Sequence, residues 1–309
     1  MKLIDVTEHF KTEDDCLDYI EKMRWPNGEL GCVHCGEVGH VSKITRHTGS
    51  KNKRQRLYEC GACGEQFSAT SGTIFHKSHL PLTKWFMAIA LICEAKKGIS
   101  ALQVQRHIGG TYRTIWHLCH RIREAMKESN FEFLTGVVET DETYLTPRKP
   151  RKGFPKVKKQ EEMVVLGMRQ RGGPLRLIPV KAGRMEHIEP EVVKHIHPEA
   201  LLQTDKAMTY DIIGRRRFVN HRMIDHIRTY GEGENHTNTV ESAFSLLKKG
   251  VYGTFHKVSI KHLGRYCNEF SYRFNRRGMQ LRMFDATLRN LTNGKALPYK
   301  NLTAEVVRG

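Results

Sequence analysis

The sequence predicts a multidomain α+β protein: a small cysteine-containing ribbon, then a helical segment, then a C-terminal α/β domain. Three observations predict this order. Two Cys-x-x-Cys pairs lie near the N-terminus, glycine turns separate amphipathic helices in the middle, and short apolar strand-like runs alternate with helices after residue 136. The 309 residues, of which 39% are hydrophobic, suffice for two or three modest domains with cores of their own.

The charge of the chain indicates its partner. The net charge is +18, a surplus that favours a polyanion, of which nucleic acid is the commonest. The longest apolar run, Trp85–Cys93, is much shorter than the roughly 20 residues that span a bilayer, and the N-terminus lacks the apolar core of a signal peptide. We therefore expect a cytoplasmic, nucleoid-associated protein with no membrane partner and no small-molecule substrate.

The paired cysteines predict a zinc site. In a reducing compartment, Cys-x-x-Cys pairs are metal ligands more often than disulfides, and four thiolates suit tetrahedral Zn²⁺ with no open position. The two pairs are Cys32/Cys35 and Cys60/Cys63, separated by strand-like runs at 41–45 and 56–59. Redox dithiols are the alternative. His34 and His40 are rival ligands, which we expect on the surface because four cysteines already complete the shell.

The segment 80–128 predicts three helices with glycine turns. Thr83 is the expected N-cap of the first helix, Ser100 caps 101–108, Gly109-Gly110 breaks the chain, and Thr111 opens 112–127. This order is typical of helix-turn-helix DNA readers. An ordinary helical bundle with solvated basic faces is the alternative. The basic residues of the last helix are Arg113, His117, Arg121 and Arg123, and Arg113 and Arg121 are the predicted DNA contacts.

Three carboxylates follow apolar runs or open a helix in the C-terminal domain. Asp141 follows 136–140, Asp205 ends 201–204, and Glu241 begins the helical run 239–249. Two such charges about 4 Å apart repel by about 4 kcal/mol at an effective dielectric near 20, so acids that converge need a cation. Oxygen ligands favour Mg²⁺ or Mn²⁺.

Each acid also has a structural interpretation. Glu139 shares the strand face of Asp141 and is a rival ligand, and Asp205 suits the N-cap of the helix that follows it. Asn238 and Glu241 fit the first and last positions of a capping box. The order strand-acid, strands, helix, strand-acid, helix, strand, helix-acid is nevertheless what a ribonuclease-H-like α/β fold needs to bring three carboxylates together.

A basic segment interrupts the predicted strands. Residues 148–159 hold seven Lys/Arg with two prolines and a glycine, which predicts a mobile basic loop with Lys152 and Lys158 as DNA contacts. The other expected strands are 163–169, 175–180 and 217–225, and the other expected helices are 186–195 and 261–277. The expected domains are 1–30 (helical segment), 31–76 (zinc ribbon), 80–128 (helix-turn-helix-like), 135–280 (catalytic) and 281–309 (C-terminal tail).

Several blocks of the C-terminal domain resemble a known family. They are Val138–Tyr144, Thr204–Lys206, the distinctive run His236–Ser259, and Phe274–Arg277. Together with the cysteine pairs they resemble the DDE transposases of bacterial insertion sequences, in the branch with an N-terminal zinc ribbon. The resemblance implies that Asp141, Asp205 and Glu241 bind the catalytic metal. The third position varies in this branch, so Asn238 competes with Glu241 or assists it.

The resemblance also implies an activity. A pair of Mg²⁺ ions would support cleavage at the ends of the element and transfer of the freed 3′-OH into target DNA. The partners would be double-stranded DNA with terminal inverted repeats, and a second copy of the chain on paired ends. Lys248, two helical turns after Glu241, would contact a phosphate, as would His256 and Arg265. A structure-selective nuclease or resolvase of the same fold, and a zinc-ribbon regulator without catalysis, are the alternatives.

Overall fold

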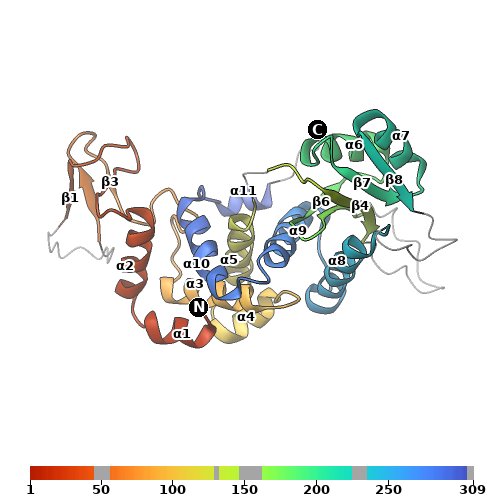
Figure 1. The fold of residues 1–309 in the computed structure, drawn as a ribbon. Coiled ribbons are helices and arrows are strands. Elements are labelled where there is room, and N and C mark those ends of the chain that lie inside the picture. Colours follow the sequence, from red (N-terminus) through yellow and green to blue (C-terminus); the bar gives the residue numbers. More distant parts are fainter. Residues whose placement is uncertain (45–55, 129–131, 146–161, 225–234, 305–309) are drawn as a thin grey trace. The chain divides into compact units, whose positions relative to one another are not determined.

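A computed structural model of the chain describes residues 1–44, 56–128, 132–145, 162–224 and 235–304. The chain divides into two compact units (Figure 1). The first unit comprises residues 1–95, 99–126 and 279–309, and the second comprises 96–98 and 127–278. None of the described helices is both long enough and apolar enough to cross a membrane.

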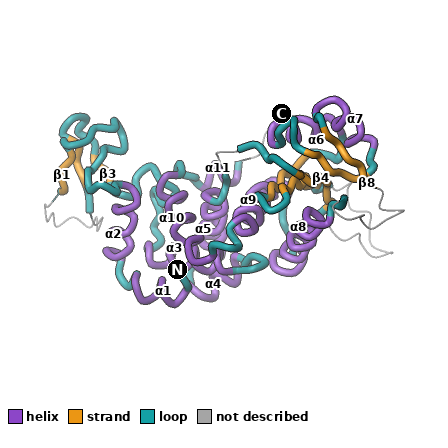
Figure 2. Tube along the Cα trace, in the orientation of Figure 1, coloured by secondary structure: helices purple, strands orange, loops and turns teal. Residues whose placement is uncertain are grey.

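The first unit is a helical assembly joined to a small antiparallel ribbon (Figure 2). Its helices are α1 (Leu3–His9), α2 (Glu13–Arg24), α3 (Leu82–Glu94), α4 (Ala101–Ile108), α5 (Tyr112–Ala125), α10 (Gln280–Asn293) and α11 (Tyr299–Thr303). Its strands are β1 (Val41–Lys43), β2 (Tyr58–Cys60) and β3 (Gln66–Phe67), in the order β1-β2-β3.

The segment expected as a C-terminal tail belongs to the core of the first unit. Helix α10 packs against α2, α3 and α5. Phe284 lies with its ring 5.8 Å from that of Phe86, and Leu288 and Leu291 are fully buried. These apolar side chains recur at helical spacing and need a partner surface, which α2, α3 and α5 supply.

Local capping sets the ends of α4 and α5. Ser100 Oγ accepts a hydrogen bond from the backbone N–H of Gln103 and begins α4 as predicted, and Thr111 Oγ1 plays the same part for α5. The prediction for Thr83 is wrong. Helix α3 begins at Leu82, whose N–H donates to the carboxylate of Glu13 instead.

The second unit is built on a five-stranded mixed sheet. The strands are β4 (Val137–Tyr144), β5 (Val164–Gln170), β6 (Leu175–Val180), β7 (Leu201–Asp205) and β8 (Asn220–Ile224), in the order β6-β5-β4-β7-β8. β4, β5 and β6 are antiparallel neighbours, whereas β7 runs parallel to both β4 and β8. Within the strand expected at 217–225, β8 begins only at Asn220 because α7 extends to Arg217, and residue 225 lies outside the described residues.

Helices cover both faces of this sheet. They are α6 (Met185–His195), α7 (Met208–Arg217), α8 (Asn238–Lys249) with its π-helical continuation η1 (Gly250–Phe255), and α9 (Ile260–Asn275). Alternate residues of β5 face opposite sides: Val165 packs in a core with α8 and α9, and Leu166 packs in a second core with α6 and α7. The sheet is therefore the middle layer of three, as Figure 1 shows for α6 to α9.

Candidate functional site

The four paired cysteines form one compact cluster. Cys32 Sγ lies 3.7 Å from Cys63 Sγ, Cys35 Sγ lies 3.7 Å from Cys60 Sγ, and all four sulfurs lie within 4.8 Å of one another. A tetrahedral ion with Zn–S bonds of about 2.3 Å separates its sulfurs by about 3.8 Å. The cluster therefore has the size and the donor set of a structural Zn²⁺ site.

Two glycines close the paired turns that carry these sulfurs. Gly36 has a φ of 81° and Gly64 a φ of 72°, which side chains rarely adopt, and each N–H donates to the carbonyl of the first cysteine of its pair. Among the described residues, the group of potential ligands at this point consists of the four cysteines, so His34 and His40 lie outside it.

Asp141 and Asp205 lie at the same edge of neighbouring parallel strands. β4 and β7 pair in parallel from Val137 with Leu201 to Glu139 with Gln203, and Asp141 and Asp205 each follow this last pair by two residues. The charge of Asp205 acts on Asp141, so the two carboxylates are near each other. Side chains of alternate residues share a face, so both aspartates project on the side of Glu139, which contacts α8. The topology thus brings together two acids that are 64 positions apart.

The electrostatics of Asp141 indicate that further acids are near. Burial raises the pKa of Asp141 to about 7, and the neighbouring carboxylates of Glu142, Asp205 and Glu241 add to the rise. The backbone N–H of Glu142, 2.8 Å from Asp141 Oδ1, opposes the shift only in part. Burial and the neighbouring acids disfavour the ionised form of Asp141, so a bound cation would stabilise that form.

Glu142 projects from the opposite face of β4. Its Oε2 accepts a hydrogen bond from the buried Tyr210 hydroxyl at 2.6 Å, on the α7 side of the sheet. Burial raises the pKa of the Glu142 carboxyl, and the charge of Asp205 raises it further. The charge of Glu142 thus repels that of Asp141, whereas the Glu142 carboxylate itself is stabilised by the Tyr210 hydroxyl.

Helix α8 presents an exposed polar stripe. Asn238 and Glu241 are exposed in its first turns, and Ser245 and Lys248 continue the same face as exposed and partly exposed residues. The predicted capping box is not formed, because the N-cap residue is Thr237 and its side chain makes no cap. Glu241 Oε1 instead accepts a hydrogen bond from Thr237 Oγ1 at 2.9 Å.

Glu139 caps helix α8, a role that its sequence position did not predict. The side chain of Glu139 is fully buried, and its Oε2 accepts the backbone N–H groups of Thr239 and Val240 at 2.9 and 3.1 Å. Its Oε1 forms an ion pair with Arg171 Nε at 2.8 Å. Glu139, predicted as a rival metal ligand, therefore caps α8. Its position on the face of Asp141 was the only signal in the sequence.

Gly167 lets α8 approach the sheet. This residue of β5 pairs with Asp141, and a Cβ atom there would lie 2.6 Å from two ring carbons of Phe244 and 2.8 Å from Val240 Cγ2. Such distances are shorter than a van der Waals contact, so only glycine fits without movement. The close packing keeps the first turns of α8 beside the strand that carries Asp141.

A divalent ion suits the donors at this edge, although they do not surround one point as the sulfurs do. Among the described residues, only the cysteines form a set of ligand atoms within a single ion's reach. Asp205 Oδ1 accepts the N–H of Ala207 at 3.1 Å in a turn, but Ala207 is the N-cap of α7, so Asp205 is not. Three carboxylates and the Asn238 amide are oxygen donors of the kind that Mg²⁺ and Mn²⁺ prefer.

The predicted DNA contacts have different environments. Arg113 is exposed at the first turn of α5, with its guanidinium 4.5 Å from the ring centroid of Tyr299. Arg121 is buried, lies 4.9 Å from the ring centroid of Trp85 and donates to the carbonyl of His76. The prediction that Arg121 faces DNA is therefore not supported, because packing in the helical core takes up its guanidinium.

The remaining predicted contacts belong to the second unit. His256 is exposed and has a φ of 58°, an uncommon backbone conformation for a residue other than glycine. Arg265 is partly buried on α9, 3.1 Å from His262 Nδ1. Lys152 and Lys158 lie outside the described residues.

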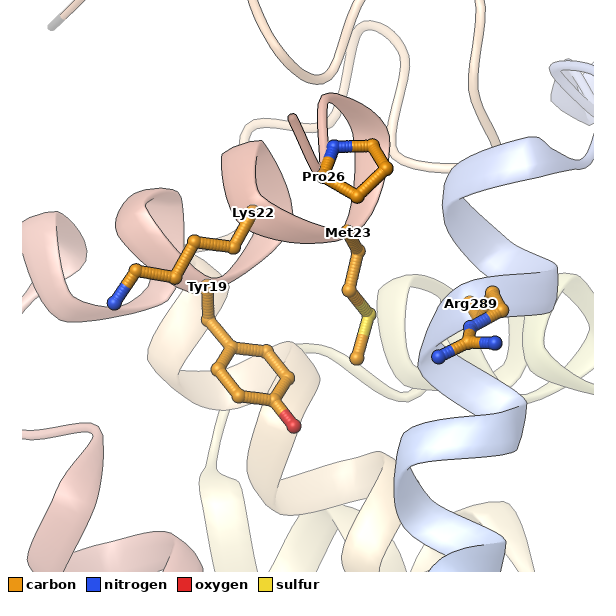
Figure 3. Close-up of a pocket in the computed structure, with 5 residues that line it drawn as sticks. All are labelled: Tyr19, Lys22, Met23, Pro26 and Arg289. Atoms are coloured by element: carbon orange, nitrogen blue, oxygen red, sulfur yellow. The ribbon is translucent and has the colours of Figure 1, made fainter. Parts of the chain in front are cut away.

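A pocket in the first unit has no metal-binding side chain in its lining. It lies between α2 and α10 and is lined by Tyr19, Lys22, Met23, Pro26 and Arg289 (Figure 3). The Tyr19 hydroxyl donates to Asp285 at 2.7 Å. None of the five lining side chains is a carboxylate, a thiol or an imidazole, so this pocket offers none of the usual metal ligands.

Comparisons with known proteins match the part of the chain that holds the cysteine cluster and the part that holds the five-stranded sheet. Residues 11–66 match the transposase zinc-ribbon domain, and residues 133–275 match the ISXO2-like transposase domain. An uncharacterized protein in transposable element ISH50 of Halobacterium salinarum is 25% identical over 279 residues, which cover 85% of this chain and 91% of that protein. No solved structure matches the chain. With a transposase zinc ribbon followed by an ISXO2-like transposase domain, the chain belongs to the DDE transposases of insertion sequences.

Proposed function

We propose that this transposase cuts DNA at the ends of an insertion sequence and joins the freed 3′-OH to target DNA. The observation that carries the proposal is that three acids lie near one edge of the sheet. Asp141 and Asp205 each lie two residues beyond the last pair of the parallel strands β4 and β7, and Asp205 and Glu241 are near enough to raise the pKa of Asp141. A fold that holds acids together in this way implies a cation that offsets their repulsion.

Asp141, Asp205 and Glu241 would hold this cation, which is Mg²⁺ or Mn²⁺. Divalent ions supply two effects in phosphoryl transfer: they lower the pKa of water, and they stabilise negative charge on phosphate oxygens. Asn238 lies three residues before Glu241 at the start of the same helix and is a competing or additional ligand. We favour Glu241 because a carboxylate binds a divalent ion more strongly than a neutral amide does.

The strand order supports a ribonuclease-H-like fold for the second unit. Numbered within the sheet, its strands follow the order 3-2-1-4-5, with the first three antiparallel and the last two parallel to the first. In such a fold, the first and fourth strands each deliver an acid to one edge and the helix after the last strand delivers the third. Asp141, Asp205 and Glu241 have these positions.

Basic side chains near the acids would hold the DNA backbone. Lys248 shares the stripe of α8 with Glu241 and would bind a phosphate at the end of the element. His256 and Arg265 follow in the chain and would extend this contact, as would Lys152 and Lys158 of the basic loop. Paired ends of an element need two copies of the site, so we expect the chain to act as an oligomer.

Strand cleavage tests the proposal. The substrate is a DNA that carries the repeats flanking the coding region, incubated with Mg²⁺ and wild-type chain, Asp205→Ala, Glu241→Gln or Asn238→Ala. We expect cleavage and joining to target DNA by the wild type and neither by Asp205→Ala. Unimpaired cleavage by Asp205→Ala would refute the site. Full activity of Glu241→Gln with none in Asn238→Ala would move the third ligand to Asn238, and cleavage without joining would favour a nuclease.

A further inference from the structure

We infer that Glu139 is a positioning residue for the catalytic metal site: its carboxylate fixes the first turn of α8, and thereby Asn238 and Glu241, relative to Asp141. The inference rests on the proposed function, since it assigns Glu139 to the same metal site. It goes beyond that function because Glu139 would act through the helix and would itself touch neither metal nor DNA.

The contacts of Glu139 account for both carboxylate oxygens. Oε2 accepts three hydrogen bonds from the start of α8: from Thr239 N at 2.9 Å, from Thr239 Oγ1 at 2.7 Å and from Val240 N at 3.1 Å. Oε1 pairs with Arg171 Nε at 2.8 Å and lies 3.3 Å from His236 Nδ1. A buried acid with this many polar partners is held in place by the protein.

These bonds replace a missing local cap. The first four N–H groups of a helix have no partner within the helix, and α8 has no side-chain cap at Thr237. Glu139, a hundred residues earlier than Thr239, supplies the acceptor and places a negative charge at the positive end of the helix. The position of this helix end therefore depends on strand β4.

Arg171 ties the same point to the neighbouring strand. Besides its ion pair with Glu139, Arg171 donates from Nη2 to Gln203 Oε1 at 2.8 Å and to the carbonyl of His236 at 3.0 Å. Gln203 lies on β7, two residues before Asp205. One partly buried network thus connects the strand of Asp141, the strand of Asp205 and the chain that enters α8.

The position of α8 affects the proposed metal site because the capping contacts lie close in sequence to the proposed ligands. Glu139 and Asp141 are two residues apart on one strand face, so about 6.6 Å of strand separates the cap from the first acid. Glu241 comes directly after Val240, whose N–H the cap holds. A shift of the helix end would move Glu241 away from Asp141, and partners of this kind typically alter metal affinity by about 10–100-fold.

Glu139→Gln is the direct test, made on the full-length, zinc-loaded chain. The substitution keeps the shape of the side chain but replaces one acceptor oxygen with an NH₂ group. This NH₂ group is a donor and faces a second donor, either the Arg171 guanidinium or the N–H groups of the helix end, so hydrogen bonds are lost there. Glu13→Gln is the matched control, because the Glu13 carboxylate accepts the N–H of Leu82 at the start of α3 in the first unit.

Two measurements separate a positioning role from a general loss of stability. Mn²⁺ affinity is measured from the electron paramagnetic resonance signal of free Mn²⁺, and hydrogen exchange is followed in the peptide that contains Thr239 and Val240. We expect Glu139→Gln to weaken Mn²⁺ binding by about tenfold or more and to speed exchange of these amides. Glu13→Gln should change neither, whatever it does to the melting temperature.

The outcomes distinguish the inference from the proposed function. Wild-type Mn²⁺ affinity in Glu139→Gln, or unchanged exchange at the start of α8, would overturn the inference. Asp205→Ala is measured alongside, and wild-type Mn²⁺ affinity in that variant would overturn the proposed metal site itself. Should Glu139→Gln not fold, Thr239→Ala removes only the hydroxyl donor. A smaller weakening in the same direction is then expected, and unchanged Mn²⁺ binding would refute the role of the cap.

Discussion

The raised pKa of Asp141 predicts that metal binding and stability both change near neutral pH. The pKa lies at about 7, against 3.8 for a free aspartate, because the site is buried and acidic. A shift of roughly three pKa units corresponds to a cost on the order of 4 kcal/mol for holding the ionised form in the folded, metal-free protein. The substitution Asp141→Asn removes this cost, since the amide does not ionise.

The raised pKa of Asp141 should destabilise the folded, metal-free chain as the pH rises. Well below the ordinary pKa of 3.8 the carboxyl is protonated in both the folded and unfolded chain, and near pH 4 the penalty from Asp141 is still small. As pH rises towards 7 the unfolded chain loses the proton while the folded chain keeps it, and the folded state loses stability. Above pH 7 the penalty is constant. Without metal, Asp141→Asn should therefore exceed the wild type in stability by much more at pH 8 than at pH 4.

Metal binding should show the complementary behaviour. The ion binds the ionised carboxylate, so the apparent affinity of the wild type should rise by about tenfold between pH 6 and pH 8 and then level off. Calorimetric titration with Mn²⁺ in buffers of different ionisation enthalpy measures the affinity and the proton released near pH 6.5. Chemical denaturation at pH 4 and pH 8 measures the stability difference between the wild type and Asp141→Asn.

Two results would refute this reasoning. One is a metal-free Asp141→Asn variant that is no more stable than the wild type at pH 8, which would mean that Asp141 carries no electrostatic cost. The other is Mn²⁺ affinity that stays constant from pH 6 to pH 8. Comparing the two chains at each pH cancels the titration of the cysteine cluster, which both share.

The other predictions concern the ribbon, the packing of α8 and the basic residues. Removing zinc with a chelator should unfold the ribbon and expose Trp25, which packs beside the cluster, as a red shift of tryptophan fluorescence. Gly167→Ala should cost about 1–3 kcal/mol in chemical denaturation, because the new methyl group meets Phe244. Arg121→Ala should lower the melting temperature, whereas Arg113→Ala should leave it unchanged and reduce the salt slope of DNA binding by about one, as measured by fluorescence anisotropy.

Local sequence patterns predicted the elements whose ends depend on local contacts. Ser100 and Thr111 each cap the helix that follows them, and their cap bonds join residues three apart. The apolar run before Asp205 is a buried strand that ends at this residue, as its hydrophobic pattern predicted. In these cases the information that fixes the structure lies within one turn or one strand.

The start of α8 could not be predicted in this way, because its acceptor is distant in sequence. Asn238 and Glu241 satisfy the pattern of a capping box, yet the N–H groups bond to Glu139. A buried, charged acceptor competes successfully with a local one, since charge-assisted hydrogen bonds are the stronger kind. The close approach at Gly167 was equally hidden, because a glycine within a strand does not reveal which helix will pack on it.

Two acids on the same face of β4 differ in what surrounds them, and the difference suggests their roles. Glu139 has donors on both oxygens, including the positive end of a helix and a guanidinium, so its charge is balanced within the protein. Asp141 has one backbone N–H and three acidic neighbours, so its charge is not balanced. A balanced buried charge fixes geometry, and an unbalanced one favours binding of a cation. The sequence alone offers two similar carboxylates two residues apart, and the surrounding donors distinguish the positioning residue from the proposed metal ligand.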